Sequence, residues 1–149
     1  MKKILFVCHG NICRSTTAQW VFEDLVRKAS LQNSYEIDSA ALTGEEIGNP
    51  IYPPMARVLD AHHIFYGDHR ARRMTLSDAK HFDHIYYMDD ENRWHLERLL
   101  SGHSELLSKC EPLSKHKEIS DPWYTRNFEK AYAQILEACK ERLEEIEHE

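Results

Sequence analysis

A cysteine and an arginine lie six positions apart near the start of the chain, at Cys8 and Arg14 of the segment CHGNICRS. The apolar run at residues 4–7 precedes this segment and a helical pattern follows it, which predicts a loop between a buried strand and a helix N-terminus. Such a loop gathers unpaired backbone N–H groups and the positive end of a helix dipole. With a thiol and a guanidinium in it, the loop would both bind a phosphate-like anion and attack it.

The spacing of Cys8 and Arg14 is common by itself, and the surrounding residues make it informative. Gly10 and Asn11 belong to the types that best tolerate left-handed backbone angles. Both the helix N-terminus and the guanidinium favour a thiolate at Cys8, and Ser15 is placed to hydrogen-bond its sulfur. The alternative is an inert buried thiol beside a surface arginine. The predicted phosphate-binding loop comprises Cys8, His9, Gly10, Asn11, Ile12, Cys13, Arg14 and Ser15.

Hydrolysis of a phosphate ester also needs an acid that protonates the leaving oxygen. Asp121 lies in a Pro-containing segment beside Trp123 and Tyr124. These aromatic residues would wall a cleft and stack on an aromatic leaving group. From the residues alone, a simple Asp-Pro turn is the favoured interpretation of this segment.

Composition limits the classes of protein to which the chain can belong. Its 149 residues fit a single domain over 1–149, and a formal charge of −6 argues against nucleic acid as a partner. We expect no membrane association and a cytoplasmic location, because no apolar run is long enough to span a bilayer and no leader is evident. The four cysteines then suggest free thiols in a reducing compartment. The ten histidines form no recognisable metal spacing with cysteine, so neither metal nor cofactor is expected.

Strand and helix patterns alternate along the chain, which predicts an α/β domain with a parallel sheet covered on both faces. Predicted strands lie at residues 4–7, 35–40, 84–88 and 109–113. Predicted helices lie at 15–28, 55–62, 75–79, 90–100 and 126–147. The helix at 90–100 carries Trp94, Leu96, Leu99 and Leu100, and the basic cluster at 70–73 is interpreted as solvated surface.

Five blocks of the sequence resemble those of the low-molecular-weight protein tyrosine phosphatases, in the order of that family. These are VCHGNICRS at 7–15, DSAA at 38–41, EIGNP at 46–50, YMD at 87–89 with Asn92, and DPWY at 121–124. The resemblance covers nearly the whole chain. It implies a four-stranded parallel sheet of order 2-1-3-4, flanked by helices on both faces.

The resemblance also implies roles for individual residues. Cys8 would be the nucleophile, Arg14 the phosphate clamp and Asp121 the general acid, which then serves as base when water hydrolyses the phosphocysteine. Asn11, Ser15, Ser39 and His62 match the residues that support the loop in that family. Cys13 matches a second cysteine that forms a reversible disulfide with Cys8, a form that protects the nucleophile from over-oxidation.

The expected substrates are phosphotyrosine-containing proteins and small aryl phosphates, with the enzyme a monomer or weak homodimer. Ile12, Glu45, Trp123 and Tyr124 are predicted to line the substrate cleft. Four residues depart from the family's usual pattern and bear on substrate preference, namely Thr16, Gln19, Glu45 and Trp123. Acidic residues at 45 and 46 would disfavour acidic phosphopeptides.

Three other functions stay open at this stage. An arsenate reductase of similar fold would need further cysteines in a mobile segment, and residues 80–92 contain none. A protein-arginine phosphatase of the same family typically has threonine before the second cysteine, where this chain has Ile12. A phosphate-binding module without catalysis would not need nucleophile, clamp and acid together.

Overall fold

A computed structural model describes residues 1–149, and its centre is a sheet of four parallel strands in the order β2-β1-β3-β4. The strands are β1 (Lys2–Cys8), β2 (Tyr35–Ala41), β3 (His84–Tyr87) and β4 (Cys110–Pro112). Order and direction confirm the expected fold class. The last strand is shorter than the predicted 109–113.

Strand β1 is paired on both sides. Its residue Ile4 is in register with Ile37 of β2 and with His84 of β3. The apolar run from Ile4 to Val7 is fully buried, as expected of a central parallel strand that is covered on both faces. The chain leaves β1 towards β2 on one side and later returns to β3 on the other. The C-terminal end of β1 is therefore the switch point at which open α/β sheets bind ligands.

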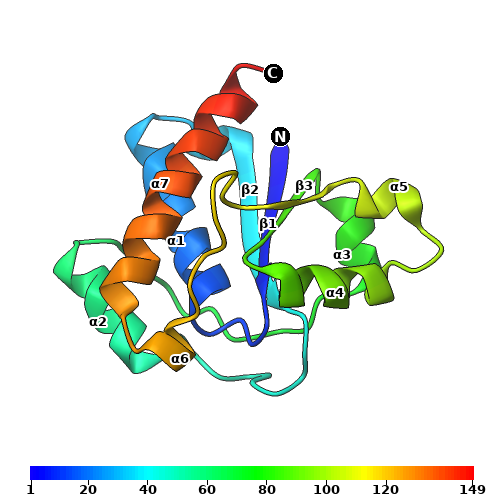
Figure 1. Ribbon diagram of the computed structural model, residues 1–149. Coiled ribbons are helices and arrows are strands. Elements are labelled where there is room, and N and C mark those ends of the chain that lie inside the picture. The colour runs from blue at the N-terminus through cyan, green and yellow to red at the C-terminus, as the bar shows by residue number, and fades with distance from the viewer.

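Helices cover both faces of the sheet (Figure 1). They are α1 (Arg14–Lys28), α2 (Pro53–Ala61), α3 (Leu76–His81), α4 (Asp90–Leu99), α5 (Ser104–Leu107), α6 (Pro122–Thr125) and α7 (Phe128–Glu147), with a short 3-10 turn at Gln32–Ser34. Helices α1, α2 and α7 pack on one face, and α3, α4 and α5 on the other. No helix is of a length and apolarity that would let it cross a membrane.

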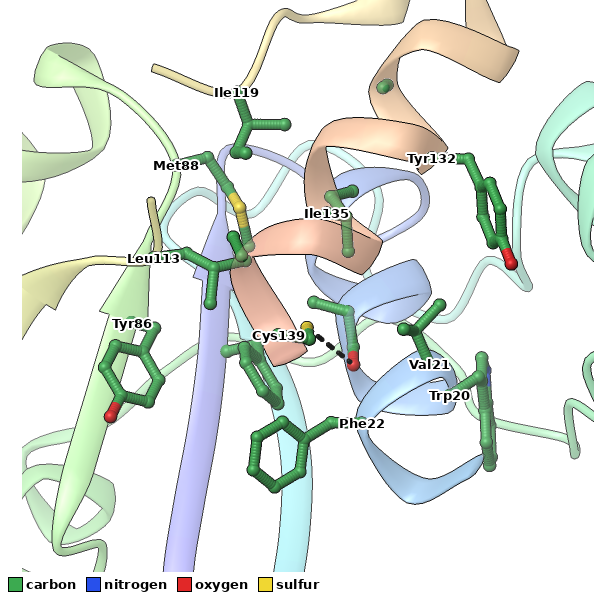
Figure 2. Close-up of a cluster of buried hydrophobic side chains, with 14 of the residues drawn as sticks. Trp20, Val21, Phe22, Tyr86, Met88, Leu113, Ile119, Tyr132, Ile135 and Cys139 are labelled. Carbon is green, nitrogen blue, oxygen red and sulfur yellow. Dashed lines mark hydrogen bonds between the residues drawn. The ribbon is translucent and has the colours of Figure 1, made fainter. Parts of the chain in front are cut away.

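The larger core lies between the sheet and the pair α1 and α7 (Figure 2). Phe22 of α1 packs against Phe6 of β1 and Tyr35 of β2, with ring centroids 5.5 and 5.7 Å away. Ile135 and Cys139 of α7 are fully buried in the same cluster. Both helices bury side chains at helical spacing, and this packing sets the position of α1 on the sheet. The loop that precedes α1 is positioned by the same contacts.

Helix α4 buries Leu96, whereas Trp94 is 53% exposed and Leu99 is 38% exposed, because only a narrow stripe of this helix faces the sheet. One sequence interpretation needs correction. The segment 70–73 is not simply solvated surface. Arg72 forms ion pairs with Asp38 at 3.0 Å and with Asp78 at 2.9 Å.

A buried arginine joins α7 to the segment that leads towards Asp121. Arg142 is 2% exposed and donates from Nε to the carbonyl of Leu113 at 3.1 Å and from Nη2 to that of Pro112 at 2.6 Å. Its guanidinium also stacks on the ring of Tyr86, 4.8 Å from the centroid. The end of β4 therefore depends on α7 for its hydrogen bonds.

We expect Arg142→Met to lower the free energy of unfolding by about 2–4 kcal/mol, because buried carbonyl groups lose their donors. Arg57 is exposed on α2 and offers the matched control, since Arg57→Met should change stability by less than ~0.5 kcal/mol. Urea unfolding of both variants measures the difference. Equal stability of the two variants would contradict a structural role for Arg142.

Candidate active site

The predicted phosphate-binding loop lies at the switch point of the sheet. Cys8 is the last residue of β1, and Arg14 is the first residue of α1. The nucleophile candidate is thus anchored by a buried strand, and the residues after it open the first turn of a helix. The backbone N–H groups at such a helix start have no partner within the helix and point towards the loop.

Three hydrogen-bonding groups surround the sulfur of Cys8. The thiol donates to Ser15 Oγ at 3.0 Å, and the backbone N–H groups of Asn11 and Ser15 donate to Sγ at 3.3 and 3.4 Å. The thiol itself is only 4% exposed. A negative charge on the sulfur is therefore met by hydrogen bonds inside a water-poor site, where they are strongest.

The side chain of Asn11 joins the loop to the rest of the molecule. Its backbone is left-handed, with φ of 60°, and its side chain is buried. The Nδ2 group donates to Ser15 Oγ at 2.8 Å and to Ser39 Oγ at 2.9 Å. Oδ1 accepts from His69 Nε2 at 2.8 Å and from the backbone N–H of Arg72 at 3.3 Å. Of the two flexible residue types expected here, Asn11 alone adopts positive φ.

Ser39, which matches a loop-supporting residue of the family, belongs to this network. Its hydroxyl donates to Gln19 Oε1 at 2.6 Å and lies 3.2 Å from His69 Nε2. Gln19, which departs from the family's usual glutamate, thus has a defined partner. Thr16, the other departure near the loop, is the third residue of α1 rather than the first, and it is buried.

The structure corrects the prediction that His62 supports the loop. His62 lies just after α2, where it stacks on Tyr132 at 4.2 Å and contacts Glu129 at 2.9 Å. The supporting histidine is His69, from the connection between α2 and α3. Nothing in the local pattern distinguishes His69 from other histidines, because its partners come from β2 and the phosphate-binding loop.

Arg14 is buried and held by acidic groups. Its Nη1 donates to Asp89 Oδ2 at 2.8 Å and to the carbonyl of Ile119 at 2.9 Å, while Nη2 lies 3.4 Å from Asp121 Oδ2. Burial opposes its charge, but the neighbouring Cys8 and the two carboxylates raise the pKa of Arg14. Asp89, which also caps α4 through a bond from Asn92 N–H, therefore orients the guanidinium.

Asp121 stands across the cleft as the N-cap of α6, where its Oδ1 accepts from the backbone N–H of Trp123 at 3.0 Å. The preceding residue Ser120 is bound to Gln134 of α7 through both its backbone N–H and its hydroxyl, at 2.9 and 3.0 Å. Hydrogen bonds therefore hold the backbone next to Asp121 in place, while the carboxylate of Asp121 remains partly exposed in the cleft.

A cleft of about 670 Å³ joins these groups. Its lining includes Cys8, Arg14 and Asp121 together with the four predicted cleft residues Ile12, Glu45, Trp123 and Tyr124. Sequence reasoning missed Tyr52, whose ring lies 5.5 Å from that of Trp123 and forms a second aromatic wall. Its only sequence signal is an aromatic residue at the end of the Pro-rich loop before α2.

Two features of the loop face the rim of the cleft. A side chain at Gly10 would come within 3.2 Å of Glu46 Cγ. The imidazole of His9 lies between Glu45 and Glu91, 2.6 and 2.7 Å from their carboxylate oxygens. Although burial opposes its charged form, these hydrogen bonds raise the pKa of His9.

Cys13 is half-buried and lines the cleft together with Cys8. Burial, reinforced by the neighbouring Cys8, raises the pKa of the Cys13 thiol. The two cysteines therefore have different environments. Cys8 receives several hydrogen bonds at its sulfur, whereas Cys13 sits in surroundings that keep its proton in place.

A thiol ringed by backbone N–H groups, a buried guanidinium beside it and a carboxylic acid across an aromatic cleft define the class of cysteine-dependent phosphatases. The family model for low molecular weight phosphotyrosine protein phosphatase matches residues 3–149. The low molecular weight phosphotyrosine protein phosphatase of Gallus gallus is 38% identical over 151 residues, covering 97% of this chain and 95% of the relative.

Solved structures agree with this match. The crystal structure of YfkJ from Bacillus subtilis has a TM-score of 0.94 at 34% identity, covering 99% of this chain and 96% of that one. A drosophila arginine phosphatase has a TM-score of 0.88 at 31% identity, with 98% of both chains covered. The chain therefore belongs to the family of low molecular weight phosphotyrosine protein phosphatases.

The burial of His69 in this network leads us to predict how the stability of the protein depends on pH. Burial lowers the pKa of His69 below its ordinary 6.5, with Asp38 opposing and Arg72 adding to the shift. Below about pH 6.5 the unfolded chain therefore binds a proton that the folded chain does not, and stability falls as pH falls. We expect His69→Gln to reduce the loss of Tm between about pH 7 and pH 5.

His103, a partly exposed histidine, provides the control for this measurement, because its one ion pair is with Glu105 at the surface. His103→Gln should leave the pH dependence of Tm as it is in the wild type. If His69→Gln loses Tm with falling pH as steeply as the wild type, His69 is not held neutral in the folded protein.

Proposed function

We propose that this protein hydrolyses phosphotyrosine in proteins, and small aryl phosphates, through a covalent phosphocysteine intermediate. The observation that carries the proposal is the meeting of Cys8, Arg14 and Asp121 at one aromatic cleft. Cys8 and Arg14 belong to the phosphate-binding loop, whereas Asp121 comes from a distant segment. A binding module would need neither the hydrogen-bonded sulfur nor an acid opposite it.

In the first step the Cys8 thiolate attacks phosphorus as the bond to the phenolic oxygen breaks. Asp121, protonated, gives its proton to that oxygen, so that the leaving group departs as a neutral phenol. The backbone N–H groups of residues 9–14 and the guanidinium of Arg14 stabilise the charge on the equatorial oxygens. The product is tyrosine and a phosphorylated sulfur.

In the second step a water molecule attacks phosphorus on the side that the phenol has left. The Asp121 carboxylate takes a proton from the water, the sulfur–phosphorus bond breaks, and inorganic phosphate is released. The sulfur leaves as a thiolate, to which the hydroxyl of Ser15 donates from 3.0 Å. Ser15 is free to do so because its oxygen already accepts the amide hydrogen of Asn11.

The contacts of Arg14 prepare one edge of its guanidinium for the phosphate. Asp89 and the carbonyl of Ile119 occupy Nη1, so the group is fixed in orientation. The edge formed by Nε and Nη2 has only the long contact to Asp121. Two parallel donors on that edge match two oxygens of a phosphate, as in other arginine–phosphate pairs.

The cleft favours a flat aromatic substrate over a guanidinium. Tyr52, Trp123 and the apolar Ile12 supply stacking and van der Waals surface for a phenyl ring. Protein-arginine phosphatase activity is the second candidate, because a drosophila arginine phosphatase shares the fold at 31% identity. The apolar side chain at position 12 decides between them in favour of phosphotyrosine.

We further propose that Cys13 forms a reversible disulfide with Cys8 under oxidation. The proposal is supported by the placement of both thiols at the same cleft and by the absence of any disulfide that would occupy either one. Formation of the bond removes two electrons and two protons from the pair, which an oxidant such as hydrogen peroxide accepts. Thiol reductants in a reducing compartment, such as the cytoplasm, return the two electrons and restore both thiols. We also propose that the protein is a cytoplasmic monomer or weak homodimer.

The roles of Cys8 and Asp121 are tested with two aryl phosphates. Cys8→Ser should lower kcat for p-nitrophenyl phosphate on the order of a thousandfold or more. Asp121→Ala should lower kcat about a hundredfold for phenyl phosphate, whose leaving group needs the proton, and much less for p-nitrophenyl phosphate. Asp68→Asn, at an exposed carboxylate, is the control that should leave both rates unchanged. Undiminished turnover by Cys8→Ser would refute the mechanism.

The role of Ile12 is tested by changing it to threonine. Ile12→Thr should lower kcat/KM for a phosphotyrosine peptide about tenfold, because a buried apolar contact with the ring is lost. Hydrolysis of a phosphoarginine peptide should not fall. Ile47, which is exposed outside the cleft lining, gives the control Ile47→Thr. A parallel loss on both peptides would mean that residue 12 does not select the substrate.

A further inference from the structure

A second group of metal-ligating side chains lies beside the phosphate-binding loop, and the proposed hydrolysis uses none of them. His9 comes from the loop, while Glu91 and His95 come from α4. Because Glu91 and His95 are four residues apart on one helix, they project from the same face. The three side chains each offer one ligand atom, and these atoms all lie within 4.8 Å of one another.

The spacing of the ligand atoms suits a tetrahedral ion. Glu91 Oε2 lies 2.7 Å from His9 Nδ1 and 3.3 Å from His95 Nε2. Ligands at 2.0–2.1 Å in a tetrahedral zinc site are about 3.3 Å apart. The two imidazole rings are inclined at 71° with centroids 6.1 Å apart, so both direct a nitrogen towards the same carboxylate without stacking. The ligand nitrogens of His9 and His95 lie within 4.8 Å of each other.

Glu45 supplies the outer contact that metal-bound histidines usually have. Its carboxylate lies 2.6 Å from His9 Nε2, the ring nitrogen that does not face Glu91. An N–H at that position would donate to Glu45, while a bound ion would take the place of the proton on Nδ1, the nitrogen that faces Glu91. A carboxylate–histidine pair of this kind fixes both the tautomer and the ring orientation of a zinc ligand.

We propose that His9, Glu91 and His95 form a binding site for a divalent transition-metal ion, best matched by Zn²⁺. Two imidazoles and one carboxylate are a donor set of zinc, with a fourth position left for solvent, whereas Mg²⁺ and Ca²⁺ prefer oxygen ligands. All three side chains are partly exposed, so an ion reaches them from solvent. His9 and Glu91 also line the cleft, so the ion would place two positive charges at its rim.

The thiols of the active site are the main competing ligands for zinc, and the experiment removes them. In full-length protein carrying Cys8→Ser and Cys13→Ser, titration with ZnCl₂ followed by calorimetry should show one ion bound per chain. Adding His95→Gln or Glu91→Gln should weaken binding by tenfold or more. Adding Glu45→Gln should weaken it by about tenfold, as expected for an outer partner of a ligating histidine.

His116→Gln is the matched control, because His116 and Glu141 form a histidine–carboxylate pair without a third ligand. It should leave zinc affinity unchanged. Co²⁺ added to the same protein carrying Cys8→Ser and Cys13→Ser gives a second readout, namely visible bands of tetrahedral cobalt that His95→Gln abolishes. The proposal is overturned if no ion binds, or if affinity and the cobalt bands survive the loss of His95 and Glu91.

Discussion

The hydrogen bonds made by the buried amide of Asn11 are the constraint on which the site depends. A left-handed residue in the loop turns the backbone N–H groups inwards, and the side chain of that same residue holds the turn in place. Its partners come from α1, from β2 and from the connection after α2. These bonds hold the loop in one conformation without a bound phosphate, so in the proposed reaction its N–H donors need no rearrangement.

The parts of the site that could be predicted from the sequence are those with a local signal. An apolar run followed by a helical pattern locates β1, the loop and α1, and residue types alone identify Cys8 and Arg14. The strand order and the role of Asp121 required the family resemblance. His69, Tyr52 and Arg142 were missed because each acts through partners distant in sequence. His62 was chosen wrongly for the same reason, since sequence proximity carries no information about which histidine reaches Asn11.

Charge is distributed unevenly around the cleft. At its floor, buried Arg14 faces Asp89 and Asp121, and the helix start adds partial positive charge. At its rim, Glu45 and Glu91 surround His9. A phosphorylated side chain thus passes acidic residues before it meets the donors. The acidic rim and the donors at the floor are thus formed by separate sets of residues.

The segment that carries Asp121 is held in place by α7, which is the last element of the chain. Synthesis delivers β1 and the phosphate-binding loop first, whereas Gln134 and Arg142, which fasten the segment carrying Asp121, are translated after it. A nascent chain therefore possesses its nucleophile long before its proton donor is anchored. A chain without α7 would therefore contain Cys8 and Arg14 but lack the contacts that hold the segment carrying Asp121.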